Sequence, residues 1–162
     1  MAPCPCCGGS LKVIGSRPRK YIQDTGLQKT IIIRRLQCEN CHKIHHELPD
    51  ILIPYKRYEA SCFEKVVSLP HENDVAADNS TLFRWNCWFL GMINYWLACL
   101  RSIALRFQLD LTPMNLASTD SLTILKCLGR IFGNASGWLS RMNKPIVNVN
   151  LWVQTRSALL SS

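Results

Sequence analysis

Hydrophobic residues along this chain follow two different periods. Between residues 11 and 48 they come in short runs rich in valine, isoleucine and leucine, and from residue 58 onwards they recur at every third or fourth position. The first pattern is typical of strands and the second of helices with one buried face. Three strands are therefore expected, over 11–22, 28–37 and 43–48. Gly15 and Pro18 interrupt the first run, which favours an edge strand or a bulge and leaves open whether it is one bent strand or two short ones.

The helical pattern predicts four helices, over 58–69, about 80–108, 121–132 and 138–142. Asp78, Asn79 and Ser80 are candidate N-caps for the long second helix, and Asp120 for the third. The stretch 71–77 is ambiguous, 109–119 is a connection, and the tail 146–160 alternates loosely before it takes the helical period. The apolar stripe expected on the long helix consists of Leu82, Trp85, Phe89, Met92, Trp96, Cys99, Ile103 and Phe107.

Cysteines give the strand region its candidate chemistry. Of nine in the chain, four form two Cys-x-x-Cys pairs, Cys4 with Cys7 and Cys38 with Cys41. Two thiolate pairs on facing tight turns make the tetrahedral sulfur site that Zn²⁺ prefers, so one structural zinc ion is expected. Cys6 is an extra thiol inside the first pair. Whether one of the nearby histidines replaces a cysteine ligand stays open for His42, His45 and His46.

Pattern and cysteines together predict a small α+β protein. Residues 1–48 would form an antiparallel zinc ribbon, 49–57 a linker with two prolines, and 58–162 an all-α domain resembling a helix-turn-helix. So small a sheet buries little apolar area, and the metal would supply much of its folding free energy.

The charge favours a polyanionic partner. Nineteen lysines and arginines against 11 acidic residues give a net charge of +8, which points to nucleic acid first and to an anionic membrane surface second. Arg34 and Arg35 are adjacent, so strand alternation sends them to opposite faces. The candidate DNA-binding residues are Arg17, Arg19, Lys20, Lys29, Arg34, Arg35, Lys56, Arg57, Thr81 and Arg84.

The stretch from Trp85 to Leu100 lacks charge, but it is shorter than the ~20 apolar residues of a membrane span and contains two asparagines. A buried core helix, with an interface for another copy or a protein partner, is expected instead. An odd number of cysteines cannot pair completely in disulfides, and the start Met1-Ala2-Pro3 does not resemble a signal peptide. A cytoplasmic location is expected.

Several motifs carry a family resemblance. They are Cys-Pro-x-Cys-Gly, Leu-Lys-Val-Ile-Gly-Ser-Arg, Ile-Arg-Arg-Leu-x-Cys-x-x-Cys, His-His-Glu-Leu-Pro at 45–49 and Pro-Tyr-Lys-Arg-Tyr at 54–58. In this order they resemble an uncharacterised bacterial zinc-ribbon family associated with mobile elements, similar to the N-terminal zinc-binding regions of insertion-sequence transposases. The resemblance covers residues 1 to about 107 and implies DNA binding, with no known reaction. A transposase-associated or regulatory factor is the function it implies.

No catalytic motif is present. The sequence contains neither a phosphate-binding Gly-x-x-x-x-Gly-Lys-Ser/Thr loop nor Gly-x-Ser-x-Gly, and several of its acidic residues fall at turns or caps. A non-enzymatic double-stranded DNA-binding protein is the leading hypothesis. Two alternatives are a protein-interaction module that uses the ribbon and the aromatic helix, and a single-strand or RNA binder in which Tyr21 or Tyr55 stacks on bases.

Overall fold

The N-terminal part of the chain forms a long twisted hairpin. Its strands are β1 (Leu11–Ile22) and β2 (Gln28–Cys38), which pair antiparallel, with a register shift between Val13 and Gly15. Of the two expected alternatives, both are present: β1 is a single strand at the edge of the sheet, and its register shifts next to Gly15. The computed structural model describes residues 3–68, 74–110, 112–114, 120–133, 135–153 and 158–161.

Two further strands complete a four-stranded mixed sheet in the order β1-β2-β3-β4. β3 (Ile44–Pro49) pairs antiparallel with β2, and β4 (Ala158–Ser161) pairs parallel with β3. The prediction of a purely antiparallel sheet is wrong at this last strand, and so is the helix expected at the end of the tail. A short apolar run such as Ala-Leu-Leu is compatible with a buried strand as well as with a helix. Its pairing with the distant strand β3 determines that it is a strand here.

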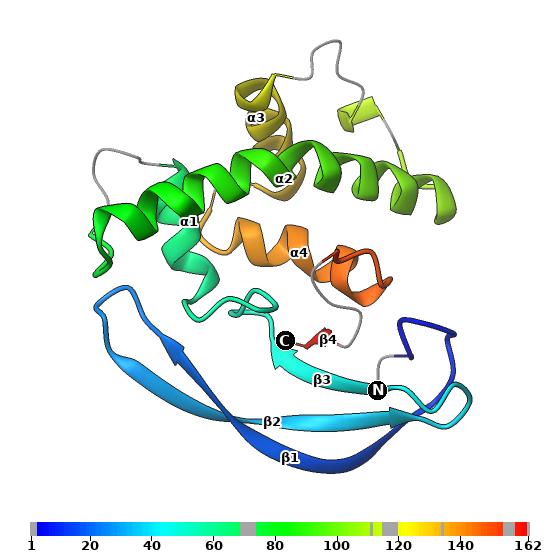
Figure 1. Ribbon diagram of the computed structural model, residues 1–162. Coiled ribbons are helices and arrows are strands. Elements are labelled where there is room, and N and C mark those ends of the chain that lie inside the picture. Colours follow the sequence, from blue (N-terminus) through cyan, green and yellow to red (C-terminus); the bar gives the residue numbers. More distant parts are fainter. Residues whose placement is uncertain are drawn as a thin grey trace.

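The helices lie together on one side of the sheet (Figure 1), with α4 between the sheet and α2. They are α1 (Ala60–Ser68), α2 (Asn79–Arg106), a 3₁₀ turn η1 (Thr112–Met114), α3 (Ser121–Phe132) and α4 (Trp138–Asn148). Asp78 caps α2 and Asp120 caps α3 through bonds from Thr81 N and Thr123 N, as expected. The end expected for the first helix at Leu69, and residues 71–73 and 115–119 of the predicted connections, lie outside the described residues.

α4 continues past the point where a stop was expected. Pro145 lies inside the helix, and the prediction that 143–145 would end it is wrong. Met142, Ile146 and Val147 are all buried, so the packing of this face outweighs the hydrogen bond that proline removes.

One hydrophobic core joins sheet and helices. It combines Ile33, Leu48 and Leu160 of the sheet with side chains of all four α-helices. Its centre is aromatic: Trp85, Phe89 and Trp96 of α2 are buried as expected, and Trp96 stacks on Trp152 with ring centroids 5.7 Å apart. The domain boundaries at 48 and 57 stay a prediction.

α2 is the one helix of the described part that is long and apolar enough to cross a membrane, by length and composition alone. In its most apolar stretch 44% of the residues are buried inside the protein. A core helix of a water-soluble protein has the same properties, so α2 is weak evidence for a membrane span, and the cytoplasmic location stays a prediction.

Candidate metal centre and basic face

The two Cys-x-x-Cys pairs meet at one end of the sheet. The sulfurs of Cys4, Cys7, Cys38 and Cys41 all lie within 4.8 Å of one another, with 3.7 Å between Cys4 and Cys41 and 3.5 Å between Cys7 and Cys38. A tetrahedral site with Zn–S bonds of about 2.3 Å places its sulfurs roughly 3.8 Å apart. The four cysteines expected from the sequence therefore form a cluster that can hold a metal ion of this kind.

Each pair sits on a turn of the same design. Gly8 N–H donates to Cys4 O at 2.8 Å, and His42 N–H donates to Cys38 O at 3.0 Å. Both residues that follow the pairs are left-handed, Gly8 with φ 74° and His42 with φ 57°. Glycine takes this conformation without steric cost, which suits the position after the first pair. His42 takes the same conformation in the second turn, and its side chain is exposed beside the pair.

The pKa values of two of the cysteine thiols are shifted in opposite directions. The backbone N–H of Cys41 donates to Cys38 Sγ at 3.5 Å, and such bonds lower the pKa of the Cys38 thiol to about 6. Burial raises the pKa of Cys4 to about 12. A metal ion must therefore displace a proton from the Cys4 thiol. The Cys38 thiol is already mostly deprotonated near neutral pH.

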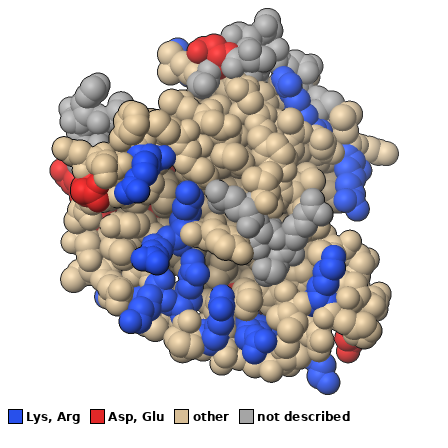
Figure 2. Space-filling model, in the orientation of Figure 1, with Lys and Arg blue, Asp and Glu red and all other residues tan. Residues whose placement is uncertain are grey.

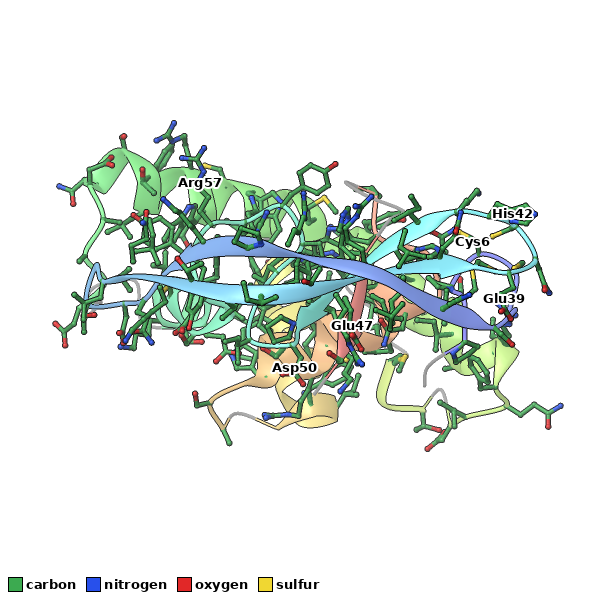
Figure 3. The ribbon with its side chains drawn as sticks, turned by 90° about the horizontal axis from the view of Figure 1, so that it is seen from below. Cys6, Glu39, His42, Glu47, Asp50 and Arg57 are labelled. Carbon is green, nitrogen blue, oxygen red and sulfur yellow. The ribbon has the colours of Figure 1, made fainter. Side chains whose placement is uncertain are left out.

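His45 is the histidine that contacts the cluster. It is fully buried, its Nε2 lies 3.4 Å from Cys4 Sγ, and Cys4, Cys6 and His45 form a second group within 4.8 Å. Donation from Nε2–H would stabilise a Cys4 thiolate against the cost of its burial. Cys6 is half-buried, and Lys43 Nζ lies 3.9 Å from its sulfur. Figure 3 shows Cys6 and His42 at the same end of the sheet, with Glu39 nearby.

A small hydrophobic cluster underlies the cysteines. Besides Cys4 and Cys38 it contains Leu11, Leu36 and Leu159. Leu159 comes from β4, so the end of the described chain packs beneath the metal-binding end of the sheet. The sequence analysis did not predict a role for Leu159, because no pattern in the tail indicates which part of the chain it packs against.

The strand register divides the arginines between two faces. Arg17 is opposite Ile33, Arg19 is opposite Ile31 and Arg35 is opposite Gly15. Residues opposite each other on antiparallel strands share a face, and Ile33 belongs to the core under the helices. Arg17, Arg19 and Arg35 thus lie on the face that turns toward the helices, whereas Arg34 and Lys20 lie on the other.

Several of the candidate DNA-binding side chains already have partners inside the protein. Arg34 pairs with Glu47, with 2.9 Å between Nη2 and Oε1, and Lys56 Nζ lies 3.9 Å from the centre of the Trp88 ring. Arg84 bonds within its own turn to Ser80 O at 3.2 Å and to Thr81 Oγ1 at 3.0 Å, and Thr81 takes part in the Asp78 cap. Arg19 donates to Lys56 O at 3.0 Å.

The other candidates have no such partner. Within the described residues, no hydrogen bond or ion pair engages the side chains of Arg17, Lys20, Lys29, Arg35 and Arg57, whose backbones are paired in the sheet or beside it. Figure 2 shows lysine and arginine side chains gathered in a band on one face, from the end of the helical layer down to the sheet. In Figure 3, Arg57 lies on one side of the hairpin and Glu47 and Asp50 on the other.

Fold and site together define the class of this protein as a small α+β protein with a four-cysteine cluster able to hold a metal ion. The chain belongs to the family described as domain of unknown function DUF6431, which matches residues 4–85, half of its length. The match includes both cysteine pairs, the first three strands and α1, and it identifies no catalytic family. No curated protein and no solved structure matches the chain.

Proposed function

We propose that this protein is a zinc-dependent DNA-binding protein without a catalytic centre of its own. The observation that carries the proposal is the band of cationic side chains on one face, several of them without a side-chain partner among the described residues, on a sheet whose end carries a compact four-cysteine cluster. Cations without internal partners keep their charge available for phosphates. The resemblance to transposase zinc ribbons supports a role as an accessory or regulatory factor of a mobile element.

Zinc is the proposed metal because of the donor set. Four thiolates at tetrahedral spacing suit Zn²⁺ better than hard cations, which prefer oxygen. Cys4, Cys7, Cys38 and Cys41 would complete its coordination, so the ion would be structural. Bound there, it would tie the hairpin ends together and contribute on the order of 10–16 kcal/mol, as in small zinc peptides.

Two surfaces would contact DNA in different ways. On the sheet and the segment beside it, Arg17, Arg35 and Arg57 would contact phosphates and supply affinity without sequence preference. At the start of α2, Thr81 and Arg84 would correspond to the turn that reaches base edges in a helix-turn-helix, and α1 would be the preceding helix. Arg84 would exchange its bonds to Ser80 and Thr81 for bonds to a base, which is possible because its side chain is exposed.

The test is DNA binding by purified variants across a salt series. Arg84→Ala should relax sequence preference and cost about 1–3 kcal/mol for the preferred site. Arg17→Ala and Arg57→Ala should weaken all sequences alike and lower the salt slope by about 0.9 for each lost phosphate contact. Arg106→Ala, at the other end of α2, is the matched control. Unchanged binding by an Arg84→Ala, Arg17→Ala, Arg57→Ala triple variant would contradict the proposal.

A protein-interaction role has one observation in its favour. Phe83, Leu90 and Leu105 on α2 are 69%, 51% and 66% exposed. Their spacing places them along one side of the helix, away from the core. A second copy of the chain would cover them, and sedimentation of the DNA-free protein tests this: a monomer at all concentrations would count against it.

A further inference from the structure

We propose that a hollow between β1, β3 and the segment 49–57 binds one 5′-phosphorylated, unpaired nucleotide, with the phosphate at Arg17 and Arg19 and the base on Tyr55. This inference rests on the proposed nucleic-acid binding and names the part of the ligand that one site takes. A free mononucleotide and the end of a DNA strand present the same chemistry, and the experiment below separates them.

The hollow has the size and lining for a phosphorylated sugar. Its volume is about 270 Å³, and the residues around it include Arg17, Arg19, His46 and Tyr55. Leu48 and Pro54 provide an apolar wall. Sites for whole drug-sized ligands begin at about 300 Å³, so this one suits a phosphate and sugar inside with the base at the mouth.

Positive charge in the hollow has no counter-charge. None of the described residues that line it is acidic. Burial, followed by the charges of Arg17, Arg35 and Arg19, lowers the pKa of His46, and burial with Arg17 and Arg57 lowers the pKa of Arg19. The cations therefore repel one another where they meet, and a phosphate would relieve that repulsion.

Arg19 has a hydrogen-bond donor left over. Its Nη2 is fixed by the bond to Lys56 O at 3.0 Å, whereas its Nε–H is buried without an acceptor in the described part of the chain. Buried donors without partners are uncommon in folded proteins. The Arg19 guanidinium therefore has hydrogen-bonding capacity that no described residue uses.

The backbone conformation of Tyr55 places this residue at the mouth of the hollow. It is 68% exposed and has φ 69°, a left-handed conformation that is rare for a tyrosine. Its neighbours are fixed, since Pro54 is buried and Lys56 lies on Trp88. Strained backbone that the surroundings enforce is a feature of binding sites. The exposed ring beside two arginines offers a stacking surface for a base.

The base on Tyr55 must be unpaired. In a duplex, bases are stacked on their neighbours, and only a strand end, a loop or a flipped nucleotide presents a free ring face. The site would therefore distinguish a single-stranded overhang from a blunt end, and a nucleotide from inorganic phosphate.

Isothermal titration with thymidine 5′-monophosphate, thymidine and inorganic phosphate tests the site directly. The monophosphate should bind at least fivefold tighter than either of the others. Arg17→Ala should weaken it about tenfold and Tyr55→Ala about fivefold, whereas Tyr55→Phe keeps the ring and the affinity. Arg106→Ala removes an equal charge from α2, outside the residues that line the hollow, and should change nothing. Thermal melts of each variant establish that it is folded.

A second arm identifies the source of the nucleotide. A DNA hairpin with a 5′-phosphorylated overhang should bind tighter than the same hairpin with a blunt end, and Tyr55→Ala should abolish the difference. Binding of the mononucleotide without that difference would assign the site to free nucleotides. No binding of the monophosphate, or binding that both Arg17→Ala and Tyr55→Ala leave unchanged, would overturn the inference. Blunt duplex binding that survives that result would leave the proposed function standing.

Discussion

A buried carboxylate shows how single residues connect distant elements. Glu64 of α1 is 6% exposed and accepts bonds from the backbone N–H groups of Gly137 and Leu139, both at 2.8 Å. Gly137 is the N-cap residue before α4 and has no side chain to cap it. Glu64 therefore provides the N-terminal cap of another helix, where the helix dipole also favours its negative charge.

Loss of this cap should be costly. Glu64→Ala leaves the half-buried N–H of Gly137 and the buried N–H of Leu139 without their acceptor and should lower the free energy of unfolding by about 2–3 kcal/mol. Glu64→Gln keeps one acceptor and should cost about half as much. Urea unfolding followed by circular dichroism measures both, with Glu39→Ala on the exposed surface as the control. Equal midpoints for the Glu39 and Glu64 alanine variants would contradict this role.

Two other caps make stability sensitive to acid. Bonds from the Ser80 and Thr81 hydroxyls and from Thr81 N–H hold the pKa of Asp78 well below its usual range, and Thr123 N–H and its hydroxyl lower the pKa of Asp120. A folded pKa below the unfolded value of about 3.9 stabilises the protein above that pH, and the gain is lost as pH falls through the folded pKa. Melting temperature should therefore drop steeply below about pH 4.

Asparagine caps a helix almost as well as aspartate and does not titrate there. Thermal melts of an Asp78→Asn, Asp120→Asn variant between pH 2.5 and 6 should show a shallower acid dependence than wild type. Parallel curves for the two proteins would mean that these caps do not contribute to acid unfolding.

Contacts that a residue makes with its neighbours in sequence were predictable, and contacts with residues far along the chain were not. Asp78, Asp120 and Gly8 act within a few residues of their own position, and their roles follow from the sequence around them. Glu64 and His45 act on residues far along the chain. Nothing near Glu64 indicates that Gly137 lacks a cap, and three adjacent histidine candidates did not indicate that His45 alone would contact Cys4.

Among the elements, β4 contributes to both hydrophobic cores although it is only four residues long. Its residues alternate between the two cores: Ala158 and Leu160 pack with the helices, and Leu159 packs under the cysteines. The side chain of Asn148 in α4 bonds both Leu160 N and Leu160 O, at 2.8 and 3.0 Å, and so pairs the outer edge of the strand. β4 therefore ties the helical layer to the metal-binding end.

Truncation of Leu159 should loosen that end. Leu159→Ala removes a buried side chain and should cost about 2–4 kcal/mol. Because its neighbours include Cys4 and Cys38, the variant should also release zinc at a lower chelator concentration. Val153→Ala, at an exposed position, is the control. A destabilised variant that retains zinc as well as wild type would separate β4 from the metal site.

The long helix was predictable from its period, whereas the fourth strand was not. The stripe on α2 repeats over many turns, and the buried Trp85, Phe89 and Trp96 follow it. β4 is short, and its partner β3 lies at the other end of the sequence, so no local period could place it. The same limit applies to Pro145, which ends a helix in isolation but not in a packed core.

In the whole molecule, two cores meet along one sheet, and the cysteine cluster closes one end of it. The division into a strand region and a helical region was visible in the sequence, and so were the four cysteines. The basic face was only half predictable. Strand alternation predicted that Arg34 and Arg35 lie on opposite faces. The pairing of Arg34 with Glu47 depends on the register between β2 and β3, and the contact of Lys56 with Trp88 depends on the path of the segment 49–57, so neither could be predicted from the sequence.

The central claim is that one zinc ion, held by Cys4, Cys7, Cys38 and Cys41, closes this end of the sheet. Native mass spectrometry of the purified chain measures it most directly, on wild type and on Cys4→Ser, Cys6→Ser and Cys38→Ser variants. The account predicts one zinc ion in wild type and Cys6→Ser, and none in Cys4→Ser or Cys38→Ser. Zinc that persists without Cys4 and disappears without Cys6 would contradict it.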